Sequence, residues 1–213
     1  MSSATLSRPR QEAYGQEPLT WVDRFGVYLS KRAILRRLPR QTDLNVLDLG
    51  CGFQATLLRA LQPYLNAGVG VDVSVSKEAK RCAQLAFLES SMEEALPTFD
   101  DSRFDLVLLI SALEHVWQPQ RVLEQCYRIL KRDGLLCVNV PTWRGKAFLE
   151  FSAFRMGTSP SREMNDHKMY YDKRDLWPLL VRAGFRPSAI RLQYHKLGLN
   201  LFATARKETG DVS

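Results

Sequence analysis

The glycine-rich run at residues 45–52, NVLDLGCG, constrains the fold of this chain more than any other stretch. It predicts a buried β-strand that ends at a tight glycine turn and leads into a helix. Residues 68–72, GVGVD, predict the next parallel strand, which ends in the carboxylate of Asp72. Together the two runs predict an open α/β sheet that binds a nucleoside-bearing cofactor over the carboxyl ends of its first two strands, with Asp72 accepting hydrogen bonds from ribose hydroxyls.

The residues of the glycine turn leave two kinds of cofactor open. Gly50, Gly52 and Ala55 fit the spacing G-x-G-x-x-A, which also occurs in nicotinamide-dependent enzymes. Asp48 argues against that alternative, because the turn and helix of a dinucleotide site hold a negatively charged pyrophosphate that a carboxylate would repel. A ligand that carries an ammonium and a sulfonium group would instead be attracted.

The order acidic residue, hydrophobic residue, G-x-G resembles the first motif of the class I S-adenosylmethionine-dependent methyltransferases. The resemblance covers residues 42–140 well and residues 172–206 loosely, and it implies S-adenosyl-L-methionine as the cofactor. Later runs are similar to other motifs of that family: residues 89–93, 104–107, 110–116 and 131–136. The cofactor contacts that the resemblance implies are Asp48, Gly50, Cys51, Gly52, Asp72, Val73, Ser91, Met92 and Ser111.

Gln54 departs from the family pattern, since most relatives have a third glycine at this position. Glycine there permits a close approach or a positive φ, whereas the Gln54 amide could itself bond to the cofactor. The departure leaves a non-catalytic S-adenosylmethionine-binding protein open beside an active enzyme.

The alternation of apolar and amphipathic runs predicts the α/β class and a Rossmann-like methyltransferase fold. We expect a doubly wound, mostly parallel seven-stranded sheet with a reversed C-terminal edge strand. The expected strands are residues 44–49, 68–71, 85–88, 104–110, 135–140, 185–192 and 199–205. The expected helices are residues 19–38, 55–61, 76–83, 119–130 and 174–183.

The expected organisation has two parts. Residues 1–40 form an N-terminal arm and helix that packs on the sheet or covers the cofactor as a lid. Residues 41–213 form a single methyltransferase domain with a substrate-side insertion at residues 141–171.

Length and composition fit one soluble cytoplasmic domain. The 213 residues are 45% hydrophobic and 25% charged, which is ordinary for a globular protein. No apolar run approaches the roughly 20 residues that span a bilayer, and no secretory signal is expected at the N-terminus. The four cysteines lack C-x-x-C spacing, which favours reduced thiols and gives no reason to expect a metal such as zinc.

The net charge of +7 is unevenly distributed. Residues 1–40 hold 8 Lys/Arg and 3 Asp/Glu, residues 41–140 hold 9 and 13, and residues 141–213 hold 13 and 7. The basic flanks could attract an anionic substrate or an anionic membrane surface, or could simply be solvated. No nucleic-acid-binding module is evident, so nucleic acid is not an expected partner.

Methyl transfer to a hydroxyl is helped by a base that removes its proton, and histidine titrates in a suitable range. His115, directly beyond the fourth expected strand, and His167 are the catalytic candidates, with a structural role open for each. Residues 141–171 interleave aromatic and basic side chains where loops usually shape substrate pockets. The substrate-binding candidates are Arg144, Lys146, Arg155, Lys168, Tyr170 and Tyr171.

The sequence as a whole favours an S-adenosylmethionine-dependent methyltransferase. We expect O-methylation of a small-molecule, glycan or lipid-precursor acceptor, one that carries a negative charge. A nicotinamide-dependent oxidoreductase and a non-catalytic binding protein are the alternatives.

Overall fold

The strands expected from the sequence form one sheet in this computed structural model, which describes residues 21–38, 43–147 and 167–208. The strand order is β3-β2-β1-β4-β5-β7-β6. The strands are β1 (Leu44–Leu49), β2 (Leu65–Asp72), β3 (Leu85–Glu89), β4 (Phe104–Ile110), β5 (Leu130–Pro141), β6 (Ile190–His195) and β7 (Asn200–Arg206).

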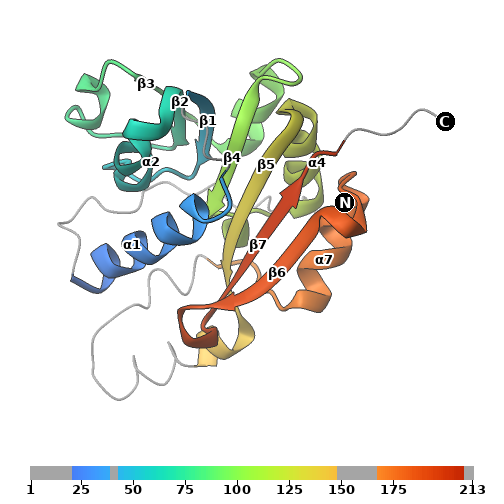
Figure 1. The fold of residues 1–213 in the computed structure, drawn as a ribbon. Helices are drawn as coiled ribbons and strands as arrows, with labels where there is room; N and C mark the ends of the chain where they lie inside the picture. The colour runs from blue at the N-terminus through green and yellow to red at the C-terminus, as the bar shows by residue number, and fades with distance from the viewer. Residues whose placement is uncertain (1–20, 39–42, 148–166, 209–213) are drawn as a thin grey trace, which may run out of the picture.

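Only β7 runs against its neighbours. The pairs among β1 to β5 are parallel, whereas β7 pairs antiparallel with both β5 and β6. The prediction of a mostly parallel seven-stranded sheet with a reversed C-terminal strand is therefore confirmed. The reversed strand lies one position inside the edge, because β7 is inserted between β5 and β6 (Figure 1).

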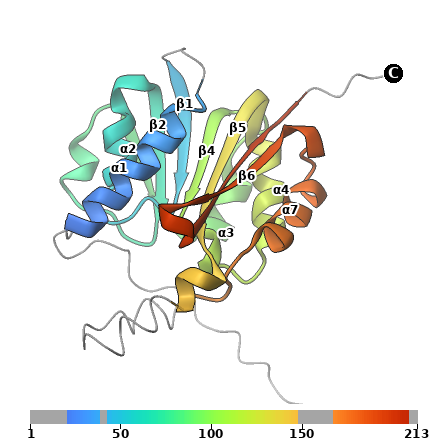
Figure 2. The same ribbon diagram turned by 60° about the horizontal axis from the view of Figure 1, so that its bottom comes forward.

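Helices cover both faces of the sheet, as a doubly wound fold requires (Figures 1 and 2). One face packs against α1 (Trp21–Leu35) and α2 (Thr56–Leu61), and the other against α3 (Met92–Ala95), α4 (Pro119–Ile129) and α7 (Lys173–Arg182). In β4, Leu106 and Leu108 join the core under α1 and α2, while Val107 and Leu109 join the opposite core. Burial on both faces explains why β4 is a continuous apolar run.

The expected helix at residues 76–83 is the clearest error of the sequence-based prediction. The structure has only the 3₁₀ turn Ala79–Arg81 there. Ser76 does cap that turn, because its Oγ accepts a hydrogen bond from the Ala79 amide at 3.1 Å. Only Ala79 of this turn is buried, so there is too little apolar contact to stabilise a longer helix.

The N-terminal helix presents its aromatic residues differently from the expected packed face. Ala33 and Ile34 are buried against the sheet, but Trp21, Phe25 and Tyr28 are 79%, 55% and 53% exposed. The helix thus packs through its C-terminal half. The expected arm before it, residues 1–17, lies outside the described residues.

Candidate functional site

The turn after β1 is tightly held between two neighbouring strands. The amides of Gly50 and Cys51 both donate to the carbonyl of Val71 at the end of β2, at 2.8 and 3.1 Å. Gly50 and Gly52 have φ of 76° and 75°, a region that favours glycine. A Cβ on Gly50 would lie 2.7 Å from the Cβ of Ala112, just after β4. The glycine turn and the segment after β4 are therefore in direct contact.

Asp72 shapes this turn in a way that the sequence did not reveal. Its Oδ2 accepts a hydrogen bond from the Gly52 amide and its Oδ1 accepts one from the Val73 amide, each at 2.8 Å. Each carboxylate oxygen can accept more than one hydrogen bond, so the predicted ribose contact is compatible with this role. Asp72 is 7% exposed, at the rim of the turn.

Asp48 is a buried acid below the same turn. It is 2% exposed, and burial, with a smaller effect from the charge of Asp72, raises the pKa of its carboxyl from 3.8 to about 7. Within the described residues no hydrogen bond or cation offsets that cost. An ammonium group placed against Asp48 would stabilise its ionised form, so the acid set at the turn fits a cationic ligand.

Cys51 is a neutral side chain in the wall of this turn. Burial, and then the charges of Asp48 and Asp72, raises the pKa of its thiol well above the ordinary range. Its Sγ would lie 2.9 Å from a Cβ on Gly70. Cys51 therefore contributes packing rather than a reactive thiolate.

Gln54 is accommodated without the third glycine. Its side-chain oxygen accepts a hydrogen bond from Ser76 Oγ at 3.1 Å. The left-handed residue here is Ala55, with φ of 46°, and not Gln54. The turn therefore does not need glycine at position 54, and the Gln54 amide oxygen bonds to protein.

Two of the expected cofactor contacts, Ser91 and Met92, lie at the start of α3. Ser91 is its N-cap, and its Oγ accepts a hydrogen bond from the Glu94 amide at 3.3 Å. Ser91 therefore caps this helix, while the cofactor contacts of Ser91 and Met92 stay predictions. Both residues are partly exposed, and Met92 packs against the core under α3 and α4.

The two predicted catalytic histidines lie side by side. His115 ends the 3₁₀ turn Leu113–His115 after β4, and its ring centroid is 5.0 Å from that of His167. The contact is set by the main chain, because the carbonyl of Glu114 accepts the amides of Lys168 at 2.8 Å and Met169 at 3.3 Å. Residues that are 52 positions apart in the sequence are therefore held together at the carboxyl edge of the sheet.

Aromatic and basic side chains continue from this pair. His167 Nδ1 is 3.1 Å from Tyr170 Oη, and the Tyr170 ring is 5.5 Å from that of Trp143. Lys146 lies over Tyr170 with its Nζ 5.9 Å from the ring centroid. Lys168 lies in the same way over Trp117, at 5.4 Å. Four of the predicted site residues, His115, His167, Lys146 and Tyr170, thus form a linked series of contacts.

Three other predicted substrate residues are not part of this series of contacts. Tyr171 is fully buried in the core, so in this conformation its side chain cannot contact an acceptor. Arg144 is exposed beside the connection between β6 and β7, near Gly198. Arg155 lies outside the described residues.

Ser111, a predicted cofactor contact, follows β4 with φ of 57°, and its amide donates to the Asn139 carbonyl at 2.8 Å.

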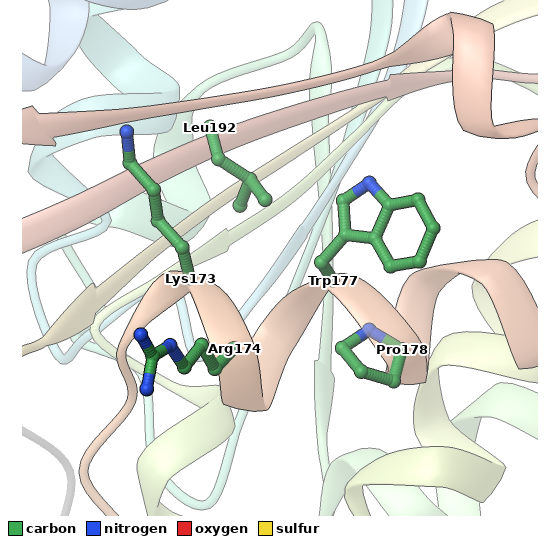
Figure 3. A pocket seen from close by; sticks show the side chains of 5 residues that line it. All are labelled: Lys173, Arg174, Trp177, Pro178 and Leu192. Carbon is green, nitrogen blue, oxygen red and sulfur yellow. The ribbon is translucent and has the colours of Figure 1, made fainter.

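A surface hollow lies elsewhere, between α7 and β6 (Figure 3). It has a volume of about 420 Å³ and is lined by Lys173, Arg174, Trp177, Pro178 and Leu192. None of these residues belongs to the predicted site. The chemistry-bearing side chains gather instead at the ends of β1, β2 and β4.

The sequence of this sheet and turn matches known proteins. Residues 47–138 match the family described as "Methyltransferase domain". A Mycobacterium tuberculosis protein named "Probable S-adenosylmethionine-dependent methyltransferase" is 28% identical over 165 residues, which are 75% of this chain and 55% of that protein. The family match and the named relative support a class I S-adenosylmethionine-dependent methyltransferase. The family implies S-adenosyl-L-methionine as the cofactor, and the nicotinamide alternative is set aside.

Other methyltransferases match over smaller parts or by fold alone. The ubiquinone biosynthesis O-methyltransferase of Coxiella burnetii is 33% identical over 110 residues, 49% of this chain and 47% of that protein. The chain thus spans about half the length of the curated relatives it matches. A Haloferax volcanii methyltransferase, solved with the Trm112 activator, has a TM-score of 0.69 at 19% identity and covers 88% of this chain and 92% of its own. An Archaeoglobus fulgidus methyltransferase gives 0.62 at 16% identity, covering 88% and 100%.

In the part of the chain that the structure describes, no helix is long and apolar enough to cross a membrane.

Proposed function

We propose that this protein transfers a methyl group from S-adenosyl-L-methionine to a hydroxyl oxygen of a small, anionic acceptor. The observation that carries the proposal is the His115–His167 pair, which stands at the same edge of the sheet as the glycine turn. The contact between Ala112 and Gly50 connects the two halves of the site.

The cofactor half of the site has the donor and acceptor groups that this cofactor needs. Asp48 would face the methionine ammonium, and Asp72 would accept hydrogen bonds from the ribose while it keeps the turn in place through Gly52. When bound, the cofactor supplies a methyl group on a positively charged sulfur. The glycine turn lets the main chain approach it closely, since Gly50 and Gly52 carry no Cβ.

The acceptor half offers a base and a means of orienting it. His167 Nδ1 is engaged with Tyr170 Oη, which fixes the ring and leaves Nε2 as the nitrogen that faces an acceptor hydroxyl. His115 lies next to it. A histidine in this position can take the hydroxyl proton as the oxygen becomes nucleophilic.

Charge and relatives support an anionic, lipid-like or aromatic acceptor. Lys146 and Lys168 stand beside aromatic rings around the histidine pair, where they can bind phosphate or carboxylate while the rings bind an apolar part. The partial match to a ubiquinone biosynthesis O-methyltransferase is in line with a hydroxyl acceptor on a lipid precursor. A cytoplasmic location and peripheral contact with an anionic membrane belong to the same proposal.

No observation favours the non-catalytic alternative. It rested on Gln54, and the structure shows that Gln54 is bonded to Ser76 while the turn keeps its shape.

Calorimetry and a turnover assay together test the proposal. S-adenosylhomocysteine should bind at micromolar strength and NAD should not, and a panel of phenolic and hydroxylated anionic acceptors should yield methylated product. His167→Ala should lower turnover by roughly two to four decades, the range for loss of a general base, and leave S-adenosylhomocysteine binding intact. Binding of NAD alone, or exclusive methylation of amines, would contradict it.

A further inference from the structure

Three side chains of metal-binding types meet beyond β4. Glu114, His115 and His167 each offer one ligand atom, and these three atoms all lie within 4.8 Å of one another. Glu114 is 1% exposed, and the two histidines are partly exposed. The set is therefore anchored by a buried carboxylate and opens toward the surface through its imidazoles.

Backbone contacts help to hold these three residues together. Glu114 and His115 belong to one 3₁₀ turn. The carbonyl of Glu114 accepts hydrogen bonds from the amides of Lys168 and Met169, which hold the segment after His167 beside that turn. The ligand atoms are thus brought close by backbone hydrogen bonds that need no ion.

The surroundings provide the second layer of contacts that metal-binding histidines commonly have. His167 Nδ1 bonds to Tyr170 Oη at 3.1 Å, which restrains the ring and leaves Nε2 as the nitrogen that can bind a cation. Tyr171 Oη is buried without a hydrogen-bond partner among the described residues. Burial, and then the charge of Glu114, raises the pKa of this phenol above the ordinary range, so Tyr171 is a neutral phenol beside Glu114.

We propose that Glu114, His115 and His167 bind one divalent transition-metal cation of the Zn²⁺, Co²⁺ or Mn²⁺ class. Two imidazoles and a carboxylate suit such ions better than Mg²⁺ or Ca²⁺, which prefer oxygen ligands alone. Three ligands at about 2.0–2.2 Å from one ion lie roughly 3.0–3.6 Å apart in tetrahedral or octahedral geometry. Atoms that now lie within 4.8 Å of one another therefore move closer by up to roughly 1–2 Å on binding, which rotation of the partly exposed imidazoles provides.

The use of this cation rests on the proposed function. Three protein ligands leave coordination positions open, as in catalytic rather than structural sites. An acceptor hydroxyl bound there loses its proton to solvent more readily, since the cation stabilises the oxygen anion that remains. In that state the histidines hold the cation, and the cation takes over the activation of the acceptor oxygen. Lys146 and Lys168 would bind an anionic group farther along the acceptor.

Metal titration of the chelator-treated full chain tests the site. Co²⁺ should bind one ion per chain with the visible absorption of a low-symmetry complex, and Zn²⁺ should displace it. His167→Ala and Glu114→Gln should each weaken Co²⁺ binding at least about tenfold, since loss of even an outer partner has that effect. His195→Asn, a histidine in β6 outside the cluster, serves as the matched control and should bind Co²⁺ as the wild type does.

Circular dichroism and S-adenosylhomocysteine affinity show whether each variant is folded. Absence of Co²⁺ and Zn²⁺ binding by the wild type, or equal binding by all four proteins, would overturn the inference. Cation binding without S-adenosylhomocysteine binding would leave the metal site standing and refute the proposed function. Full turnover in excess chelator by a chain that binds no cation would refute the metal site and leave the proposed function standing.

Discussion

Asp48→Asn should raise the stability of the protein and weaken its cofactor binding. The folded chain holds the Asp48 pKa at about 7 instead of 3.8, so this acid is protonated in the folded state over a range where the unfolded chain has released its proton. Below about pH 4 Asp48 is protonated in both the folded and the unfolded state, so it does not lower the free energy of unfolding. As the pH rises from about 4 to about 7 the free energy of unfolding falls, and above about pH 7 this decrease stays constant.

The size of the effect follows from the two pKa values. At about 1.36 kcal/mol for each pH unit, the full cost is roughly 4 kcal/mol. About 2.5 kcal/mol of it develops between about pH 5 and about pH 8. Asparagine has a similar shape and no charge, so the advantage of the variant over the wild type should grow by this amount across that interval.

Urea unfolding at several pH values measures the difference directly. Asp100→Asn, at an exposed acid, is the matched control and should follow the wild-type curve. At pH 8, Asp48→Asn should bind S-adenosylhomocysteine roughly ten- to a hundredfold more weakly than the wild type, since a charge-assisted contact is lost. Binding to the wild type near pH 6 should also release a proton, seen as a dependence of the calorimetric heat on the buffer. A variant whose stability advantage does not change with pH would refute the reasoning.

Other predictions concern the turn and the acceptor side. Asp72→Ala should weaken S-adenosylhomocysteine binding by roughly one to two decades and lower the melting temperature, because the Gly52 amide loses its acceptor; calorimetry and thermal unfolding measure both. Gly50→Ala should destabilise the protein by about 1–3 kcal/mol through its contact with Ala112 and its positive φ, and Ala112→Gly in the same chain should recover part of that loss in urea unfolding. Lys146→Ala should raise KM for an anionic acceptor at low salt, and the difference from wild type should shrink as salt is added; a salt-independent KM in both proteins would count against an anionic acceptor.

The inner strands of the sheet were predictable because they are buried on both faces. Residues 104–110 and the glycine runs carry apolar patterns typical of inner parallel strands, and the structure confirms these strands as β4, β1 and β2. The final hairpin was also predictable from two β-type runs around residues 194–198. Helix extents were less predictable, since the length of a short helix depends on contacts from elsewhere in the chain. The turn at Ala79–Arg81 and the exposed aromatic residues of α1 are examples.

The candidate site was predicted by residue type but not by arrangement. His115 was selected for its place after β4 and His167 for its type and aromatic neighbours, yet nothing in the sequence shows that the Glu114 carbonyl joins their segments. The burial of Tyr171 and the double role of Asp72 are likewise products of tertiary packing. Residues 148–166, which include the predicted Arg155, are outside the described part of the chain.

The position of β7 in the sheet affects how the chain folds during its synthesis. β6 is synthesised before β7, but its backbone partner in the sheet is β7. The outer edge of β5 pairs with residues 200–206, from Pro141 opposite Asn200 to Leu135 opposite Arg206. While the ribosome still holds those residues, β5 has an open edge that can pair with another nascent chain. When β7 emerges it closes that edge and brings β6 into the sheet in the same step.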